Sequence, residues 1–181
     1  MPERNGTRRE VRRFVILFAA VANLVLADAV TKELAAGRLK GAAAVSVIPG
    51  FFNLAYVENR GCAWGMFQGQ VWPLAVFGLL ALAFLIWKRK SVFGPGKTAA
   101  FAEPLLYAGI IGNVIDRLFR GYVVDMFDFH WGVHHYPCFN IADVLICVSV
   151  GLLLLASFRE GRKGKASTAD SRRPTDGTAG A

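Results

Sequence analysis

Two pairs of amide and carboxylate side chains have the same spacing in the second half of the chain. Asn113 and Asp116 form one pair, Asn140 and Asp143 form the other, and the two residues of each pair are three positions apart. On a helix this spacing puts both side chains on one face, so both pairs could line one cleft. Two carboxylates held close together with little solvent share a proton, because one pKa rises. Such a pair can activate a water and protonate a leaving amine, which is the chemistry of peptide hydrolysis.

Other polar residues gather at the same ends of the apolar segments, where ionisable groups are costly and therefore functional candidates. With the two pairs above they make this set: Asp28, Lys32, Asn113, Asp116, Arg117, Asp125, Asn140 and Asp143. Glu103 is the only acidic or basic residue inside an apolar segment that lies away from these ends. Simple structural roles also exist, since Asp116 and Arg117 could form an ion pair and Asn140 could cap a helix. Together, however, these side chains exceed what helix capping needs.

Four apolar segments are long enough to position these side chains. They cover residues 14–30, 71–87, 98–115 and 141–158, each of 17 or 18 residues. About 20 helical residues cross about 30 Å of hydrocarbon, and slightly shorter spans are tolerated by local thinning of the bilayer. The sequence therefore predicts an all-α membrane protein with four transmembrane helices, in one domain over residues 13–160.

The positive charge of the chain is unevenly distributed. Fifteen of the 21 Lys and Arg residues lie before residue 14, between residues 88 and 97, or from residue 159 onward. Because cationic flanks stay in the cytoplasm, we expect both termini to be cytoplasmic and the polar cluster to lie at the outer face. The net charge of +8 could instead serve acidic partners, but its distribution argues against a nucleic-acid partner.

The two ends of the chain differ from the rest. Residues 1–12 and 161–181 are polar and charged, so we predict disordered cytoplasmic tails there. Residues 14–27 also have the layout of a cleaved signal peptide, ending near Ala27-Asp28-Ala29. An Asp in the middle of a cleavage tripeptide is unusual, and we therefore predict that this segment is retained as a span.

The connection between the first two apolar segments predicts a small extracytoplasmic β-hairpin or sheet. Residues 45–48 and 51–57 are β-prone and flank Pro49-Gly50, a typical turn. Aromatic residues in this connection suit the membrane interface. The connection between residues 117 and 139 shows no clear period. The three cysteines, Cys62, Cys138 and Cys147, have no metal-like spacing, and we assign them no function.

Four segments, in order, resemble lipoprotein signal peptidase, also called signal peptidase II. Residues 28–32 are similar to the family's D-x-x-T-K, and residues 58–65 to its N-x-G-A-A-F segment, with Cys62 in place of the usual Ala and Trp64 in place of the usual Phe. Residues 112–125 resemble G-N-x-x-D-R…G-x-V-V-D, and residues 139–143 are F-N-x-A-D.

The resemblance implies a catalytic pair, Asp125 and Asp143, whereas the residue types alone do not favour Asp125 over Asp116 as the partner of Asp143. Asp116 would then be held by Arg117 or by a neighbouring backbone group. The resemblance also implies a set of substrate-binding or supporting residues: Asp28, Lys32, Asn59, Asn113, Asp116, Arg117 and Asn140.

The implied function is that of a membrane-embedded aspartic endopeptidase of the bacterial inner membrane. It would remove the signal peptide from diacylglyceryl-modified prolipoproteins, act as a monomer, and need no metal or cofactor. The substrate lipid would lie in the bilayer between the helices. The outer aromatic segment would close over the scissile bond.

Three other interpretations remain open. A metallo-enzyme could use His130, His134 and His135 with Asp125 or Asp128, although two of these histidines are adjacent. A small proton-coupled transporter could use acids within the membrane, but here they cluster at one surface and the chain has no evident repeat pair. A non-catalytic membrane assembly protein could use polar side chains as contacts between helices.

Overall fold

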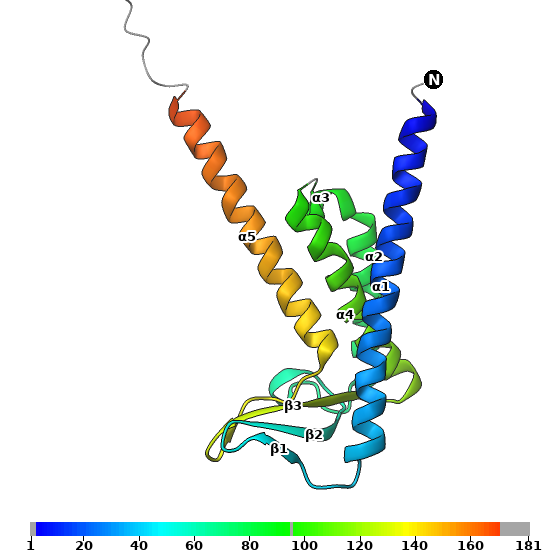
Figure 1. Cartoon of the computed structure of the whole chain (residues 1–181), viewed down its shortest axis with the longest axis vertical. Coiled ribbons are helices and arrows are strands. Elements are labelled where there is room, and N and C mark those ends of the chain that lie inside the picture. The colour runs from blue at the N-terminus through cyan, green and yellow to red at the C-terminus, as the bar shows by residue number, and fades with distance from the viewer. Residues whose placement is uncertain (1–2, 95, 171–181) are drawn as a thin grey trace, which may run out of the picture.

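A computed structural model of the protein describes residues 3–94 and 96–170 and consists of long helices that stand on a small antiparallel sheet (Figure 1). The elements in chain order are α1 (Glu3–Leu39), β1 (Val45–Ile48), β2 (Phe52–Asn59), a short 3-10 turn (Ala63–Gly65), α2 (Val71–Trp87), α3 (Arg89–Phe93), α4 (Lys97–Phe119), β3 (Val123–Trp131), β4 (His134–His135) and α5 (Ile141–Asp170).

In the described part of the chain, three helices are long and apolar enough to cross a membrane. These segments are Thr7–Leu39 in α1, Lys97–Phe119 in α4 and Ile141–Arg159 in α5. Helix α2 is apolar throughout but has only 17 residues. The predominantly helical, membrane-type architecture with a small antiparallel sheet is thus confirmed.

Helix α4 is the central element of the helical part. It packs against α1, α2 and α5, and 56% of its most apolar stretch is buried, compared with 6% in α1 and 17% in α5. Small residues allow this close packing. A Cβ atom added at Gly109 would lie only 2.5 Å from the carbonyl oxygen of Ala142 in α5. Because α4 is central, side chains near its end face both α1 and α5.

The sheet has the order β1-β2-β3-β4, and all of its neighbours are antiparallel. Strands β1 and β2 flank Pro49-Gly50, and β2 pairs with β3 so that Val57 lies opposite Asp125. Strand β3 comes from the connection in which no period is visible. Its first four residues are all buried, and a strand covered on both faces shows no alternation of apolar and polar residues.

The helical ends extend further than we expected from composition. Residues 3–12 belong to α1 and residues 161–170 belong to α5, where we predicted disordered tails. Both stretches contain Arg, Lys, Glu or Ala, which are good helix formers, and they continue helices that are already nucleated. The rest of the predicted tails, residues 1–2 and 171–181, lies outside the described residues.

Candidate active site

Asp125 and Asp143 line one cavity of about 440 Å³ where the helices meet the sheet. Asp125 lies on β3 and is only 1% exposed, whereas Asp143 lies in the first turn of α5 and is half-buried. In the described part of the chain the two carboxylates are linked through Asn113 and Asn140 rather than by a direct hydrogen bond. The topology therefore brings these two acids, 18 positions apart in the sequence, to one site.

Asp125 is held by two amide side chains. Asn59 Nδ2 donates to Asp125 Oδ2 over 2.9 Å, and Asn140 Nδ2 donates to Asp125 Oδ1 over 2.7 Å. Burial, and after it the charge of Asp143, raises the pKa of Asp125 to about 7, although both amide donors lower it. At neutral pH a substantial fraction of Asp125 is therefore protonated.

Asp143 takes part in the helix cap and also faces the cavity, as its three-residue spacing from Asn140 suggested. The backbone N–H of Asn140 donates to Asp143 Oδ2 over 3.2 Å, and the N–H of Asp143 donates to Asn140 Oδ1 over 3.1 Å. This is a reciprocal cap at the start of α5. In addition, Asn113 Nδ2 donates to Asp143 Oδ1 over 2.8 Å. The helix cap thus also orients the carboxylate that faces the cavity.

Asn140 joins the parts of the site and is fully buried. Besides its bond to Asp125, its amide nitrogen donates to Asn113 Oδ1 over 3.2 Å. The preceding residue fixes its position, because the N–H groups of Met126 and Phe127 both donate to the carbonyl of Phe139, over 3.0 and 2.9 Å. The start of α5 is therefore attached to β3.

Lys32 is buried beside the site and is 1% exposed. Its ammonium lies 2.8 Å from Asp28 Oδ2 and 3.0 Å from Asp116 Oδ2, and it donates to Asn113 Oδ1 over 3.2 Å. These three contacts match the three donors of an ammonium group. Asp28 Oδ1 also accepts from the backbone N–H of Ala142 over 2.9 Å. Asp28 and Lys32 thus connect α1 to α4 and α5.

The expected contact between Asp116 and Arg117 is not formed among the described residues. Asp116 is held instead by Lys32, by Arg120 Nε over 2.9 Å and by the backbone N–H of Val124 over 3.2 Å. Only the backbone part of that prediction was correct. Neighbouring residues on a helix point in different directions, whereas residues four apart share a face, which explains why Arg120 is the partner.

Arg117 lies on the cavity side of α4. Its guanidinium donates to the carbonyl of Gly61 over 3.1 Å and to that of Asn113 over 3.3 Å. It therefore fastens the segment after β2 over the site. The role of Arg120 was missed in the sequence, although its spacing of four from Asp116 was the available signal.

The segment of residues 60–70 lies at one rim of the cavity, to whose lining it contributes Cys62 and Ala63. Trp64 and Phe67 have left-handed backbone angles, with φ of 60° and 55°, which are uncommon for bulky residues and mark a constrained turn. The exposed Trp64 ring contacts Tyr136 edge-on, with 5.7 Å between the ring centres. Cys62 lines the cavity from this rim.

The loop histidines lie beside a different carboxylate. His135 Nδ1 is 2.6 Å from Asp128 Oδ1, and the rings of His130 and His135 stack at 5.0 Å. Burial raises the pKa of Asp128, but hydrogen bonds from His135 and Asn53 outweigh burial and hold this pKa below its ordinary value. Within residues 3–94 and 96–170 no three His, Cys, Asp or Glu side chains are grouped to hold a metal ion.

A larger apolar groove of about 980 Å³ meets the site between α2 and α4. Its walls include Leu74 and Phe77 of α2 and Ile110 of α4. Two residues of the polar cluster, Asn113 and Arg117, line both this groove and the cavity of the two aspartates. An apolar chain lying in the groove would therefore end beside the aspartates.

Comparisons with known proteins agree over most of the chain. The family model described as Signal peptidase (SPase) II matches residues 20–159. The chain is 38% identical to a lipoprotein signal peptidase of Syntrophotalea carbinolica, over 87% of this chain and 99% of that protein. It is 41% identical to one of Clostridium acetobutylicum, over 79% of this chain and 91% of that protein. A solved bacterial membrane enzyme superposes with a TM-score of 0.71 at 30% identity, over 81% of this chain and 89% of that one.

Proposed function

Because this chain belongs to the signal peptidase II family, whose members are membrane aspartic peptidases that process prolipoproteins, we propose that Asp125 and Asp143 are its catalytic pair. The observation that carries this proposal is their position: both line one cavity, and Asn140 binds the two of them. Burial and the charge of Asp143 raise the pKa of Asp125 to about 7, so the pair can hold one proton near neutral pH, as a shared-proton pair requires.

The chemical step follows from that proton. The ionised carboxylate of the pair accepts a proton from a water, which attacks the scissile carbonyl, while the protonated carboxyl donates to the carbonyl oxygen. The proton is then delivered to the leaving amine. Asn59, Asn113 and Asn140 hold the carboxylates in place without adding charge.

The substrate class fits the space beside the pair. We place the diacylglyceryl group of a prolipoprotein in the apolar groove between α2 and α4, since this groove meets the catalytic cavity at Asn113 and Arg117. The peptide would then cross the cavity under the rim of residues 60–70. The polar cluster comes from one chain, so a monomer suffices.

We also propose how the chain crosses the membrane. Spans at residues 14–30, 71–87, 98–115 and 141–158 use α2 as the fourth crossing, and α2 packs on α4 like the other helices. The described parts of the basic segments, at the start of α1, in α3 and at the end of α5, lie at the end away from the sheet. By the positive-inside rule, both termini are cytoplasmic, and the sheet and the aspartates lie at the outer face.

The decisive experiment is cleavage of a lipidated precursor by purified protein, followed on a gel. We expect Asp125→Asn and Asp143→Asn each to reduce turnover on the order of 10³-fold or more while the protein stays inserted and folded. Asp128→Asn is the matched control, because Asp128 is also a buried acid of β3 but binds Asn53 and His135. Retained turnover in either variant of the pair, or equal loss in the control, would refute the assignment. Cleavage by the purified wild type would also exclude a transporter or an assembly protein as the main activity.

A further inference from the structure

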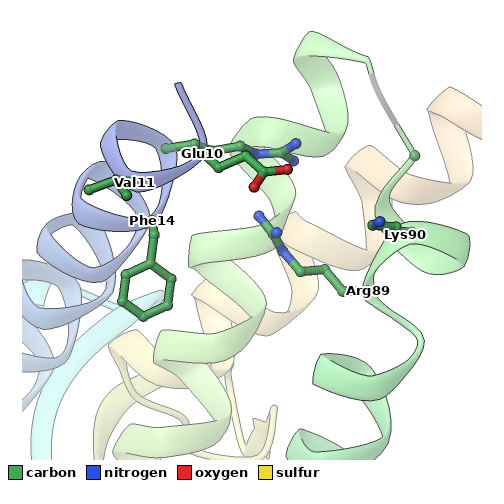
Figure 2. Close-up of a pocket in the computed structure, with 7 residues that line it drawn as sticks. Glu10, Val11, Phe14, Arg89 and Lys90 are labelled. Carbon is green, nitrogen blue, oxygen red and sulfur yellow. The ribbon is translucent and has the colours of Figure 1, made fainter. Parts of the chain in front are cut away.

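Another cavity lies between α1 and α3, at the end of the helices away from the sheet. Figure 2 shows the residues that line it, and Figure 1 shows where α1 and α3 lie. This cavity has a volume of about 720 Å³. One wall comes from α1, and the other comes from α3 and the turn after it. The lining residues are Glu10, Val11, Arg13, Phe14, Arg89, Lys90 and Gly94.

The cationic side chains of this cavity are held from behind by a buried acid. Glu103 of α4 is 2% exposed and receives both Nε and Nη2 of Arg89. Arg13 Nη2 lies 3.7 Å from Glu103 Oε2. Because a guanidinium carries five N–H donors, the bidentate pair with Glu103 leaves other N–H groups of Arg89 that can donate to a ligand. Figure 2 shows the Arg89 guanidinium directed into the space between the two walls.

The charges around the cavity leave an excess of one positive charge. Arg13, Arg89 and Lys90 are the cations, and Glu10 and Glu103 are the anions. Among the described residues no carboxylate lies within 4.0 Å of the Lys90 ammonium. The charge of the site thus matches a monoanion, and guanidinium groups bind the oxygens of a phosphodiester well.

The apolar part of the lining distinguishes a lipid from a soluble anion. Val11 and Phe14 are 57% and 68% exposed on α1, beside the cations. They begin the apolar surface of the first membrane helix, where Phe18 is also 67% exposed. A free phosphate ester would gain nothing from these side chains, whereas the glycerol and acyl chains of a phospholipid would cover them.

We propose that this cavity binds the phosphodiester headgroup of an anionic glycerophospholipid, with Arg13, Arg89 and Lys90 as its ligands. The site lies at the end to which the basic segments assign the cytoplasmic leaflet, whose anionic lipids attract such clusters. It is separate from the catalytic cavity and does not depend on the roles of Asp125 and Asp143, but it rests on the proposed orientation of the chain in the membrane. A bound lipid here would hold α1 against α3.

The test measures lipid binding by native mass spectrometry of the full chain in neutral detergent. Phosphatidylglycerol is compared with phosphatidylcholine, which has a zwitterionic headgroup, and glycerol 3-phosphate is added as a soluble competitor. The variant is Arg13→Gln/Lys90→Gln, which leaves the Arg89–Glu103 pair intact. The matched control is Arg38→Gln/Lys40→Gln, which removes one Arg in the last turn of α1 and one Lys directly after that helix, far from the cavity.

We expect the wild type and the control to bind phosphatidylglycerol at least tenfold more tightly than phosphatidylcholine, and the variant to lose this preference. Melting temperatures without lipid verify that the variant is folded, and cleavage activity in detergent should be unchanged. A wild type without preference, or equal loss in both double variants, would overturn the proposal. If glycerol 3-phosphate displaced phosphatidylglycerol at a concentration similar to that of the lipid, this would also overturn the proposal, because the site would then serve a soluble anion.

Discussion

The amide of Asn140 donates a 2.7 Å hydrogen bond to Asp125 Oδ1, so a helix cap is bonded directly to a carboxylate on a strand. The same side chain accepts the N–H of Asp143 over 3.1 Å. One buried, uncharged group thus fixes both acids. A cation in its place would lower the pKa of Asp125, whereas an amide allows one proton to remain on the pair.

We predict that Asn140→Ala reduces turnover about 100-fold, in the range seen when one aligned hydrogen-bond donor is removed from an active site. It also removes the cap of α5, at a cost of about 1 kcal/mol. The control is Asn53→Ala, which removes a comparable 3.1 Å bond to Asp128. Cleavage rates and melting temperatures are measured for both. Equal activity of the two variants would show that Asn140 only caps the helix.

The pH dependence of cleavage should show the proton on the pair. Since the pKa of Asp125 is raised to about 7, kcat/KM should fall as the pH rises through about 7, when the second carboxyl ionises. Asn59 donates to the charged form of Asp125, so Asn59→Leu should move this decline to higher pH. Rates between pH 5 and 9 test both statements. A flat profile, or a shift to lower pH in the variant, would contradict them.

The stability of the protein should depend on the same group. The pKa of Asp125 is 3.8 in the absence of the fold and about 7 within it, so folding favours the protonated form. Its contribution to the free energy of unfolding is fully present below about pH 3.8 and is lost as the pH rises to about 7. Relative to Asp125→Asn, the wild type should therefore lose stability between pH 4 and 7. The melting temperatures of both proteins are measured across this pH range. If they changed with pH by the same amount in the wild type and in Asp125→Asn, the assignment would be contradicted.

Local spacing predicted one half of the site. The three-residue interval between Asn140 and Asp143 indicated a cap and a shared face, and the structure contains both features. Asp125 differs, because it lies on a strand buried on both faces, and such a strand has no alternating pattern. Its position near Asp143 depends on the pairing of β2 with β3, which residue spacing does not specify. Only the family resemblance identified it.

The sequence predicted that Asp28, Lys32 and Asp116 lie in one cluster, but it did not predict which of these residues contact one another. Lys32 and Asp116 are far apart in the sequence, and their contact depends on how α1 packs against α4. The adjacent Arg117 was the obvious partner of Asp116 in the sequence, but it turns toward the cavity instead. Long apolar helices, in contrast, follow from the length of the apolar segments alone, and for that reason they were the most predictable part of the fold.

Removal of the buried cation should be costly. Lys32→Met leaves Asp28 and Asp116 without their shared ammonium in a buried site, and we expect a loss of about 3–5 kcal/mol in the free energy of unfolding. Lys40→Met is the control, since its pair with Glu58 is exposed and exposed pairs contribute little. Unfolding in mixed micelles measures both. Similar stability of the two variants would show that Lys32 is not the centre of the network.

The close approach of α4 to α1 makes Gly112 a sensitive position. A Cβ atom there would lie 2.6 Å from Asp28 Oδ2 and 3.3 Å from the Cβ of Ala142, so Gly112→Ala must displace the carboxylate that binds Lys32. Gly37→Ala is the control, because nothing lies within 4 Å of its added methyl group in the same kind of helix. An exposed helical Gly→Ala change stabilises by about 0.5–1 kcal/mol. We therefore expect a higher melting temperature for Gly37→Ala, and a lower one together with slower cleavage for Gly112→Ala. If both variants gained stability, α1 and α4 would have to lie further apart at Asp28 than the structure places them.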